Sequence, residues 1–186
     1  MPVLLILGAI VMGLLIGLAF GGSLRRLGEA HFRWWPLALI GLALQLVPVP
    51  TTAGQLDHRL AIGLLIASYG VLLAFVVANL RKPGFWLIGA GFVLNALAIT
   101  LNGGMPVSDH ALREAAGPYY RQTIHRLVTT GGAKHHLSRP SDVLTPLTDV
   151  IPLGPPVRQV LSVGDVVWLL GTVWVVAGAT RGGRRP

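Results

Sequence analysis

Five apolar runs constrain the fold of this chain more than any other feature of its sequence. They cover residues 3–20, 35–49, 60–80, 85–101 and 163–180. A membrane-crossing helix needs about 20 apolar residues, because the hydrocarbon core is about 30 Å thick and a helix rises about 1.5 Å per residue. Hydrophobic residues make up 53% of the chain and charged residues only 12%, about half the charged share of an average soluble domain. We therefore predict an all-α, polytopic membrane bundle of about five transmembrane helices, forming one integral membrane domain over residues 1–186.

The second run is the least regular of the five. Pro36 lies at its expected first turn, where a missing N–H costs little, whereas Pro48 and Pro50 cannot continue a helix. We expect this short helix either to tilt less than its neighbours or to stop below the outer surface.

Basic residues predict how the chain is threaded. No charged residue precedes the first run and Arg25 and Arg26 follow it, which is typical of an uncleaved helix whose amino terminus lies outside. Five spans then place only Arg59 in the short outer loop and eight basic residues on the cytoplasmic side: Arg25, Arg26, Arg33, Arg81, Lys82, Arg181, Arg184 and Arg185. We expect a multi-pass protein of the cell membrane with its amino terminus outside and its carboxyl terminus in the cytoplasm.

The formal net charge of +8 indicates which partners the chain meets. Its basic residues form short clusters between apolar runs, so we expect contact with the phosphates of the lipid bilayer and not with nucleic acid. The absence of cysteine excludes disulfides, thiolate metal sites and cysteine nucleophiles. We expect no cofactor.

Small residues predict where helices pack closely. Gly13, Gly17 and Gly21 recur at four-residue spacing in and after the first run, which would line them along one helix face. Such a face can dock another helix of the same chain, or it can join a second copy or a partner membrane protein.

Two amides lie inside apolar runs, where an unpaired polar group is costly. Gln45 stands in GLALQLV (residues 41–47) and Asn95 in the similar GFVLNAL (residues 91–97). The similarity predicts a duplicated helical hairpin in which the first two runs match the third and fourth. Each amide then either clasps a neighbouring helix or lines a polar site shared by the two hairpins.

Asp165 is the one acidic residue that could lie within a span. An intramembrane carboxylate is a candidate for handling protons or cations. The motif SVGD at 162–165 has the spacing of a capping box, in which Ser162 and Asp165 bond to each other's backbone N–H at a helix start. Under that interpretation the fifth helix begins at Ser162, and Asp165 lies at the outer interface.

The segment 102–161 separates the fourth and fifth runs. Gly103 and Gly104 after Asn102 end the fourth helix, and a short helix follows from Ser108 or Asp109 to about Ala116. A second helix opens at Pro118 and closes at Gly131-Gly132, and a third, capped by Ser141, covers residues 143–147. We expect the segment to fold back over the outer helix ends as an extracytoplasmic lid of short helices, with Asn102 at its hinge.

This lid segment holds the polar residues that could carry chemistry: His110, His125, Lys134, His135, His136, Asp142 and Asp149. Adjacent His135 and His136 would point to different sides of a helix, so a zinc site would need one of them with His125 and Asp142. No spacing demands such a site, and we predict no metal. The sequence also lacks a Gly-x-Ser-x-Gly elbow, a His-Glu-x-x-His motif and a phosphate loop.

Three short motifs resemble a known family. They are LNGGMPVS at 101–108, PLTDVIPLG at 146–154 and SVGD at 162–165. In this order and at these distances they resemble a family of small multi-span bacterial membrane proteins known only as a domain of unknown function. The resemblance covers nearly the whole chain. It implies an integral membrane protein of bacteria with no assigned activity or catalytic residue.

Three functions remain compatible with these patterns. A non-enzymatic membrane module that packs against itself or a partner is favoured by the glycine face and the missing reactive motifs. A transporter or channel subunit for a small solute or lipid would use Gln45, Asn95 and Asp165 in a polar cavity. An extracytoplasmic membrane-surface enzyme would use four lid residues: His135, His136, Asp142 and Asp149. Asn102, at the hinge between Asn95 and the lid histidines, could face a cavity.

Overall fold

The computed structural model describes residues 3–47, 55–127 and 134–182, and the fold is mostly helical. Helices occupy all five apolar runs: α1 (Val3–Ala19), α3 (Trp35–Leu46), α4 (Gln55–Asn79), α5 (Phe85–Asn102) and α8 (Val163–Arg181). Among the described residues, α4, α5 and α8 are long and apolar enough to cross a membrane, whereas α1 and α3 are apolar but shorter. The helical part of the fold prediction is confirmed.

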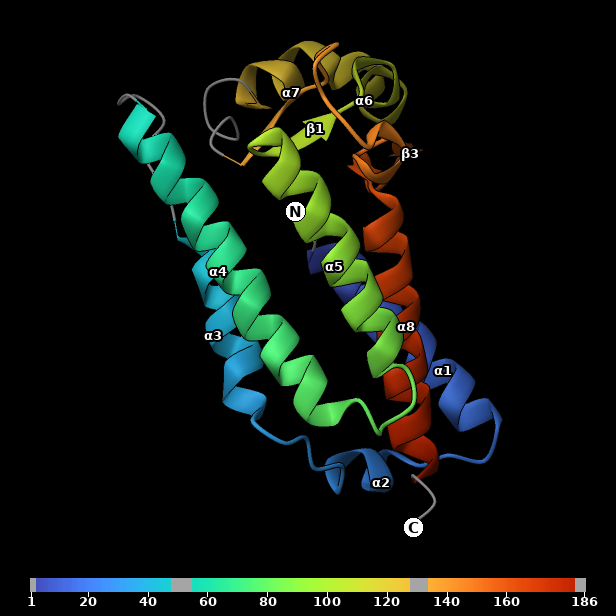
Figure 1. The fold of residues 1–186 in the computed structure, drawn as a ribbon. Coiled ribbons are helices and arrows are strands. Elements are labelled where there is room, and N and C mark those ends of the chain that lie inside the picture. Colours follow the sequence, from blue (N-terminus) through green and yellow to red (C-terminus); the bar gives the residue numbers. More distant parts are fainter. Residues whose placement is uncertain (1–2, 48–54, 128–133, 183–186) are drawn as a thin grey trace.

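The long helices pack in a row. α1 lies along α8, α8 along α5, α5 against α4, and α4 against α3 (Figure 1). The predicted hairpin of the first two runs is therefore not formed, because α1 and α3 pack on different partners. The short helix α2 (Leu24–Gly28) packs beside α8. It lies in the connection that carries the chain from α1 to α3 across one end of the bundle.

Glycine sets the close approach of α8 to both of its neighbours. A Cβ at Gly13 would lie 2.7 Å from the Val173 carbonyl oxygen, and one at Gly17 would overlap the Thr180 hydroxyl. On the other side, Gly91 faces Gly164 and Gly84 faces Gly171. Gly21 differs from the prediction: it follows the end of α1, has φ +79° and would meet nothing with a Cβ, so it serves the turn.

Polar contacts join the chain segments at the end of the bundle that holds α2. The Ser23 N–H donates to the Thr180 carbonyl at 2.8 Å, and Arg26 Nη1 donates to the Arg181 carbonyl at 3.1 Å. Asn79 is buried and clasps the backbone of Arg33, accepting from its N–H at 2.9 Å and donating to its carbonyl at 2.8 Å.

The lid segment (102–161) combines short helices with short strands over the opposite end of α5 and α8 (Figure 1). Parallel strands β1 (Met105–Val107) and β2 (His135–Leu137) pair, as do antiparallel strands β3 (Ile151–Leu153) and β4 (Gln159–Leu161). The helical elements are α6 (Asp109–Ala116), η1 (Gly117–Tyr119), α7 (Tyr120–Arg126) and η3 (Thr145–Leu147). The predicted Ser108 cap of α6 is present, and the predicted stop at Gly131-Gly132 lies outside the described residues.

Two expectations for the lid segment are wrong. It is not all-α, because its proline-containing stretches are extended and pair as three-residue strands. The predicted helix over 143–147 is only the 3₁₀ turn η3, since Leu144 has φ +53° and Pro146 offers no N–H to a helix. Ser141 does not cap it.

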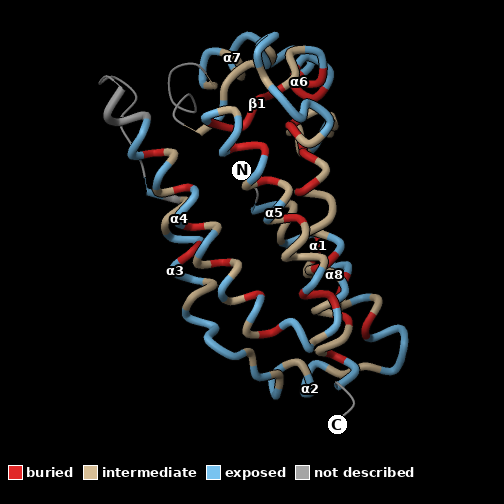
Figure 2. Tube along the Cα trace, viewed as in Figure 1, coloured by how far each residue is buried: buried red, intermediate tan, exposed pale blue. Residues whose placement is uncertain are grey.

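A small apolar core holds the lid segment to the helices. Leu65 of α4 and Ala98 and Ile99 of α5 bury Met105 of β1, and Tyr69 and Leu147 pack around them. Figure 2 shows buried residues continuing from the inner sides of the helices into the base of this segment. Tyr69 also adjoins the polar residues Asn95, Asp149 and Asp165, so a polar cluster lies beside this core.

Candidate functional site

Asn95 and Asp165 meet between α5 and α8, below the lid segment. Asn95, which is 2% exposed, donates from Nδ2 to Asp165 Oδ1 at 2.7 Å and accepts at Oδ1 from the Ser162 hydroxyl at 2.8 Å. The pair of facing glycines beside them, Gly91 and Gly164, lets the helices approach closely enough for these bonds. Asn95 is thus clasped across two helices.

The SVGD motif forms the capping box that the sequence predicts. The Ser162 hydroxyl accepts from the Asp165 N–H at 2.9 Å, and Asp165 Oδ2 accepts from the Ser162 N–H at 3.1 Å. Trp168 Nε1 adds a third donor to the carboxylate, at 3.0 Å from Oδ1. Asp165 therefore lies in the first turn of α8 and receives three hydrogen bonds, from Ser162, Asn95 and Trp168.

Tyr69 of α4 completes the cluster, and sequence reasoning did not single it out. It lies near enough to Asn95, Asp149 and Asp165 to interact with all three. Its ring packs edge-to-face on Phe92 at 5.9 Å, and Phe92 in turn packs on Trp168 at 6.2 Å. A single tyrosine inside an apolar run gives no sequence signal, because only the fold brings α4 beside α5.

Asp149 and His135 approach this cluster from the lid segment. The Asp149 side chain is 9% exposed, and its Oδ2 lies 4.0 Å from His135 Nε2. Burial, and then the charge of Asp165, raises the pKa of Asp149 well above its ordinary value. Two carboxyl groups, one from the lid segment and one from α8, thus share the polar region.

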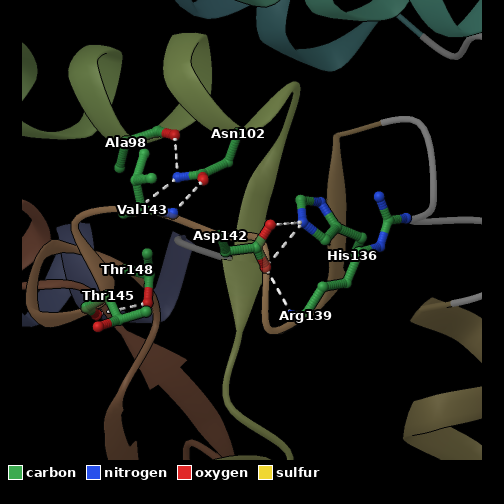
Figure 3. Close-up of polar contacts among 8 residues, drawn as sticks. All are labelled: Ala98, Asn102, His136, Arg139, Asp142, Val143, Thr145 and Thr148. Atoms are coloured by element: carbon green, nitrogen blue, oxygen red, sulfur yellow. Dashed lines mark hydrogen bonds and ion pairs between the residues drawn. The ribbon is translucent and has the colours of Figure 1, made fainter.

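His136 makes a separate pair with Asp142 (Figure 3). His136 Nε2 lies 3.2 Å from Asp142 Oδ1, and the Arg139 N–H donates to Oδ2 at 2.7 Å. Burial alone would raise the pKa of Asp142, but the bonds from Arg139 and His136 lower it overall. His135 and His136 point apart because neighbouring side chains alternate along a strand, and not because of a helix as predicted.

Asn102 is a hinge clasp. Its Nδ2 donates to the Ala98 carbonyl at 2.8 Å and to the Val143 carbonyl at 3.0 Å, while its Oδ1 accepts from the Val143 N–H at 2.8 Å (Figure 3). The end of α5 is thereby bonded to the loop before η3. Both the amide nitrogen and the amide oxygen of Asn102 thus bond to backbone groups.

Gln45 does not join Asn95. α3 packs on α4, away from α5, and the contact that ties this end of α3 to the lid segment is the Lys134 ammonium donating to the Gln45 backbone carbonyl. The shared amide site of two hairpins is therefore absent from the part of the chain that the structure describes.

The polar groups of the site are largely buried, except for His135, whose side chain is 45% exposed. His136 and Asp142 are 11% and 5% exposed, and the second ring nitrogen of His136 faces Gly104. No set of three or more His, Asp and Glu side chains gathers to hold a metal ion within the described ranges. What the arrangement can do chemically is fix the lid segment and bind a proton at Asp149.

Comparison with known proteins identifies the family. The model for the Family of unknown function (DUF5317) matches residues 29–177, which is most of the chain and includes the three motifs of the second half. No curated protein and no solved structure matches the chain. The resemblance found in those motifs is confirmed, and the chain belongs to DUF5317, a family of unknown function.

Proposed function

We propose that this protein is a non-enzymatic module of the bacterial cell membrane that works by packing against itself or a partner membrane protein. The observation that carries the proposal is that several of its polar side chains bond to other segments of its own chain. Asn79, Asn95, Asn102 and Ser162 all bond to groups on other segments of the chain.

The outward-facing side chains support membrane insertion. α1 exposes Leu4, Leu7, Val11 and Leu15, while its buried residues are the small ones that face α8. Exposed apolar surface of this extent is costly in water and favourable against lipid tails. The three helices long enough to cross, together with α1 and α3, support a proposed bundle of five spans.

The distribution of charge and tryptophan supports the proposed orientation. The end of the bundle opposite the lid segment carries Arg25, Arg26, Arg33, Arg81, Lys82 and Arg181. The exposed Trp34, Trp35 and Trp86 begin α3 and α5 at the same end, where tryptophan prefers the membrane interface. We therefore propose that this end faces the cytoplasm, and that the lid segment and the amino terminus lie outside.

Single cysteines test the orientation, because the chain has none of its own. Ser141→Cys in the lid segment and Gly28→Cys at the end of α2 both change exposed positions. Ser108 and Ser23 are less suitable for cysteine because their side chains cap helices. In intact cells, a membrane-impermeant maleimide should label Ser141→Cys at once and Gly28→Cys only after permeabilisation. The opposite pattern contradicts the proposed threading.

Extraction of the protein into native-membrane nanodiscs tests the packing role. Mass spectrometry of the intact particles should show either a second copy of this chain or a stoichiometric partner protein. Particles that contain one copy and lipid alone contradict the proposal.

A transport role is the second candidate, because Tyr69, Asn95, Asp149 and Asp165 gather polar groups between α4, α5, α8 and the lid segment. Liposomes that contain the protein and an internal pH-sensitive dye would then show proton entry that Asp149→Asn removes. Equal proton entry with and without the protein contradicts this role.

A further inference from the structure

Asp149 is held rigidly where the lid segment meets the helices. Its N–H donates to the Pro106 carbonyl at 3.0 Å, and its carbonyl accepts from the Ser108 N–H at 2.9 Å, so both backbone groups are bonded to the β1 strand and its extension. The next residue, Val150, donates to the Leu161 carbonyl at 3.1 Å, immediately before α8 begins. The backbone at Asp149 therefore cannot move away without breaking this ladder.

The two carboxyl groups in this region have opposite surroundings. Asp165 receives three hydrogen bonds, from the Ser162 N–H, Asn95 and Trp168. Within the described residues no hydrogen-bond donor reaches the Asp149 carboxyl, and its ion-pair contact is His135 at 4.0 Å. An ionised carboxylate that is 9% exposed and lacks donors is costly, so the neutral acid is the form that fits.

The charged and titratable groups around Asp149 come from three elements. Asp165 of α8 opposes a second negative charge, and Tyr69 of α4 carries none at neutral pH. His135 of β2 is 45% exposed, and its Nε2 lies 4.0 Å from Asp149 Oδ2. β1 contributes Met105, Pro106 and Val107, which do not titrate.

We propose that Asp149 is a proton-binding site, reached from solvent through His135, and that its bound proton keeps the lid segment seated on α8. When the proton leaves, the O–H bond of the carboxyl breaks and the proton passes to water by way of the His135 imidazole. The carboxylate left behind faces Asp165, and repulsion between the two charges loosens the lid segment.

The direction of the pH dependence follows from linkage. The pKa of Asp149 is raised above the value it has when the lid segment is open to water, first by burial and second by Asp165. Its contribution to seating is therefore full below the ordinary aspartate pKa and is lost as the pH rises through the raised value. Raising the pH should therefore loosen the lid segment, and lowering the pH should keep it seated.

Infrared spectroscopy of the purified full-length protein in nanodiscs tests this proposal directly. At pH 7 the wild type should show the C=O band of a protonated carboxyl, shifted when the aspartate carboxyl carbons are labelled with ¹³C. Asp149→Asn, which mimics the protonated acid, should remove the band. Glu114→Gln changes an exposed carboxyl of the same lid segment and should leave the band unchanged.

Two outcomes overturn the proposal: a wild-type spectrum at pH 7 without a protonated aspartate, or a band that persists in Asp149→Asn. Where Asp149→Asn does not fold, ¹³C-labelled wild type still decides, because the band must be present at pH 7 and vanish on alkaline titration. Hydrogen exchange on the wild type, with each rate divided by the intrinsic rate at the same pH, adds the lid readout: protection in β1 and β2 should fall at alkaline pH. The spectrum depends neither on orientation in the membrane nor on a partner, so its failure is distinct from failure of the proposed function.

Discussion

At the scale of single residues, equal side-chain chemistry has unequal consequences in this protein. Asn95 and Gln45 are both amides in apolar runs, but only Asn95 bonds across helices. Asp165 and Asp149 are both carboxyls near α8, but only Asp165 receives hydrogen bonds. The difference lies in what the fold brings within about 3 Å of each group.

The two amides predict a matched pair of variants. Asn95→Leu removes a donor from Asp165 and leaves the buried Ser162 hydroxyl without its acceptor, so it should lower the free energy of unfolding by about 1–3 kcal/mol. Gln45→Leu should change it by less than about 0.5 kcal/mol. Thermal unfolding in detergent, followed by circular dichroism, measures both, and equal losses would contradict the clasp.

At the scale of helices, glycine spacing determines which pairs can approach. α8 is contacted on one side by Gly13 and Gly17 of α1, and on the other by Gly91 of α5 and by Gly84 immediately before α5. Small residues permit the close packing that helices in lipid rely on, because lipid tails are as apolar as the helices themselves. α8 is consequently packed tightly between α1 and α5.

The glycine face of α1 predicts a difference between two positions on the same helix. A Cβ at Gly17 would overlap the buried Thr180 hydroxyl, so Gly17→Ala should destabilise the protein by about 1–3 kcal/mol. A Cβ at Gly8 would meet nothing within 4 Å, so Gly8→Ala should be neutral or stabilise by up to about 1 kcal/mol. Melting temperatures measured in the same detergent compare the two variants with the wild type. An unchanged melting temperature in Gly17→Ala would rule out the tight α1–α8 contact.

At the scale of the whole molecule, the two ends of the bundle differ in character. The end that holds α2 gathers basic residues and exposed tryptophans, whereas the other carries the folded lid segment. Four tryptophans are exposed: Trp34, Trp35, Trp86 and Trp174. Trp168 instead packs on Phe92 and bonds to Asp165.

This asymmetry predicts how lipid contacts the tryptophans. Phospholipids brominated along their acyl chains should quench most of the wild-type fluorescence, because bromine must touch the indole. A variant that keeps only Trp168, with the other four tryptophans changed to phenylalanine, should be quenched much less. Equal quenching of both proteins would show that Trp168 also faces lipid.

Much of the local structure could be predicted from the sequence. The apolar runs predicted the helices to within a few residues at most described ends, since length and hydropathy decide them locally. Ser108 and the SVGD capping box were also predictable, because a cap depends on residues three positions apart. The family resemblance rested on contiguous motifs in the same way.

The tertiary structure decided what depends on distant segments. Three-residue strands such as β1 and β2 form only because their partners arrive from 30 positions away, so the lid segment could not be recognised as partly extended. The pairing of α1 with α8 and the contrast between Asp149 and Asp165 likewise need the assembled fold. The sequence by itself determined the helices and their caps, because those energies are local, while packing, burial and hydrogen-bond partners required the whole chain.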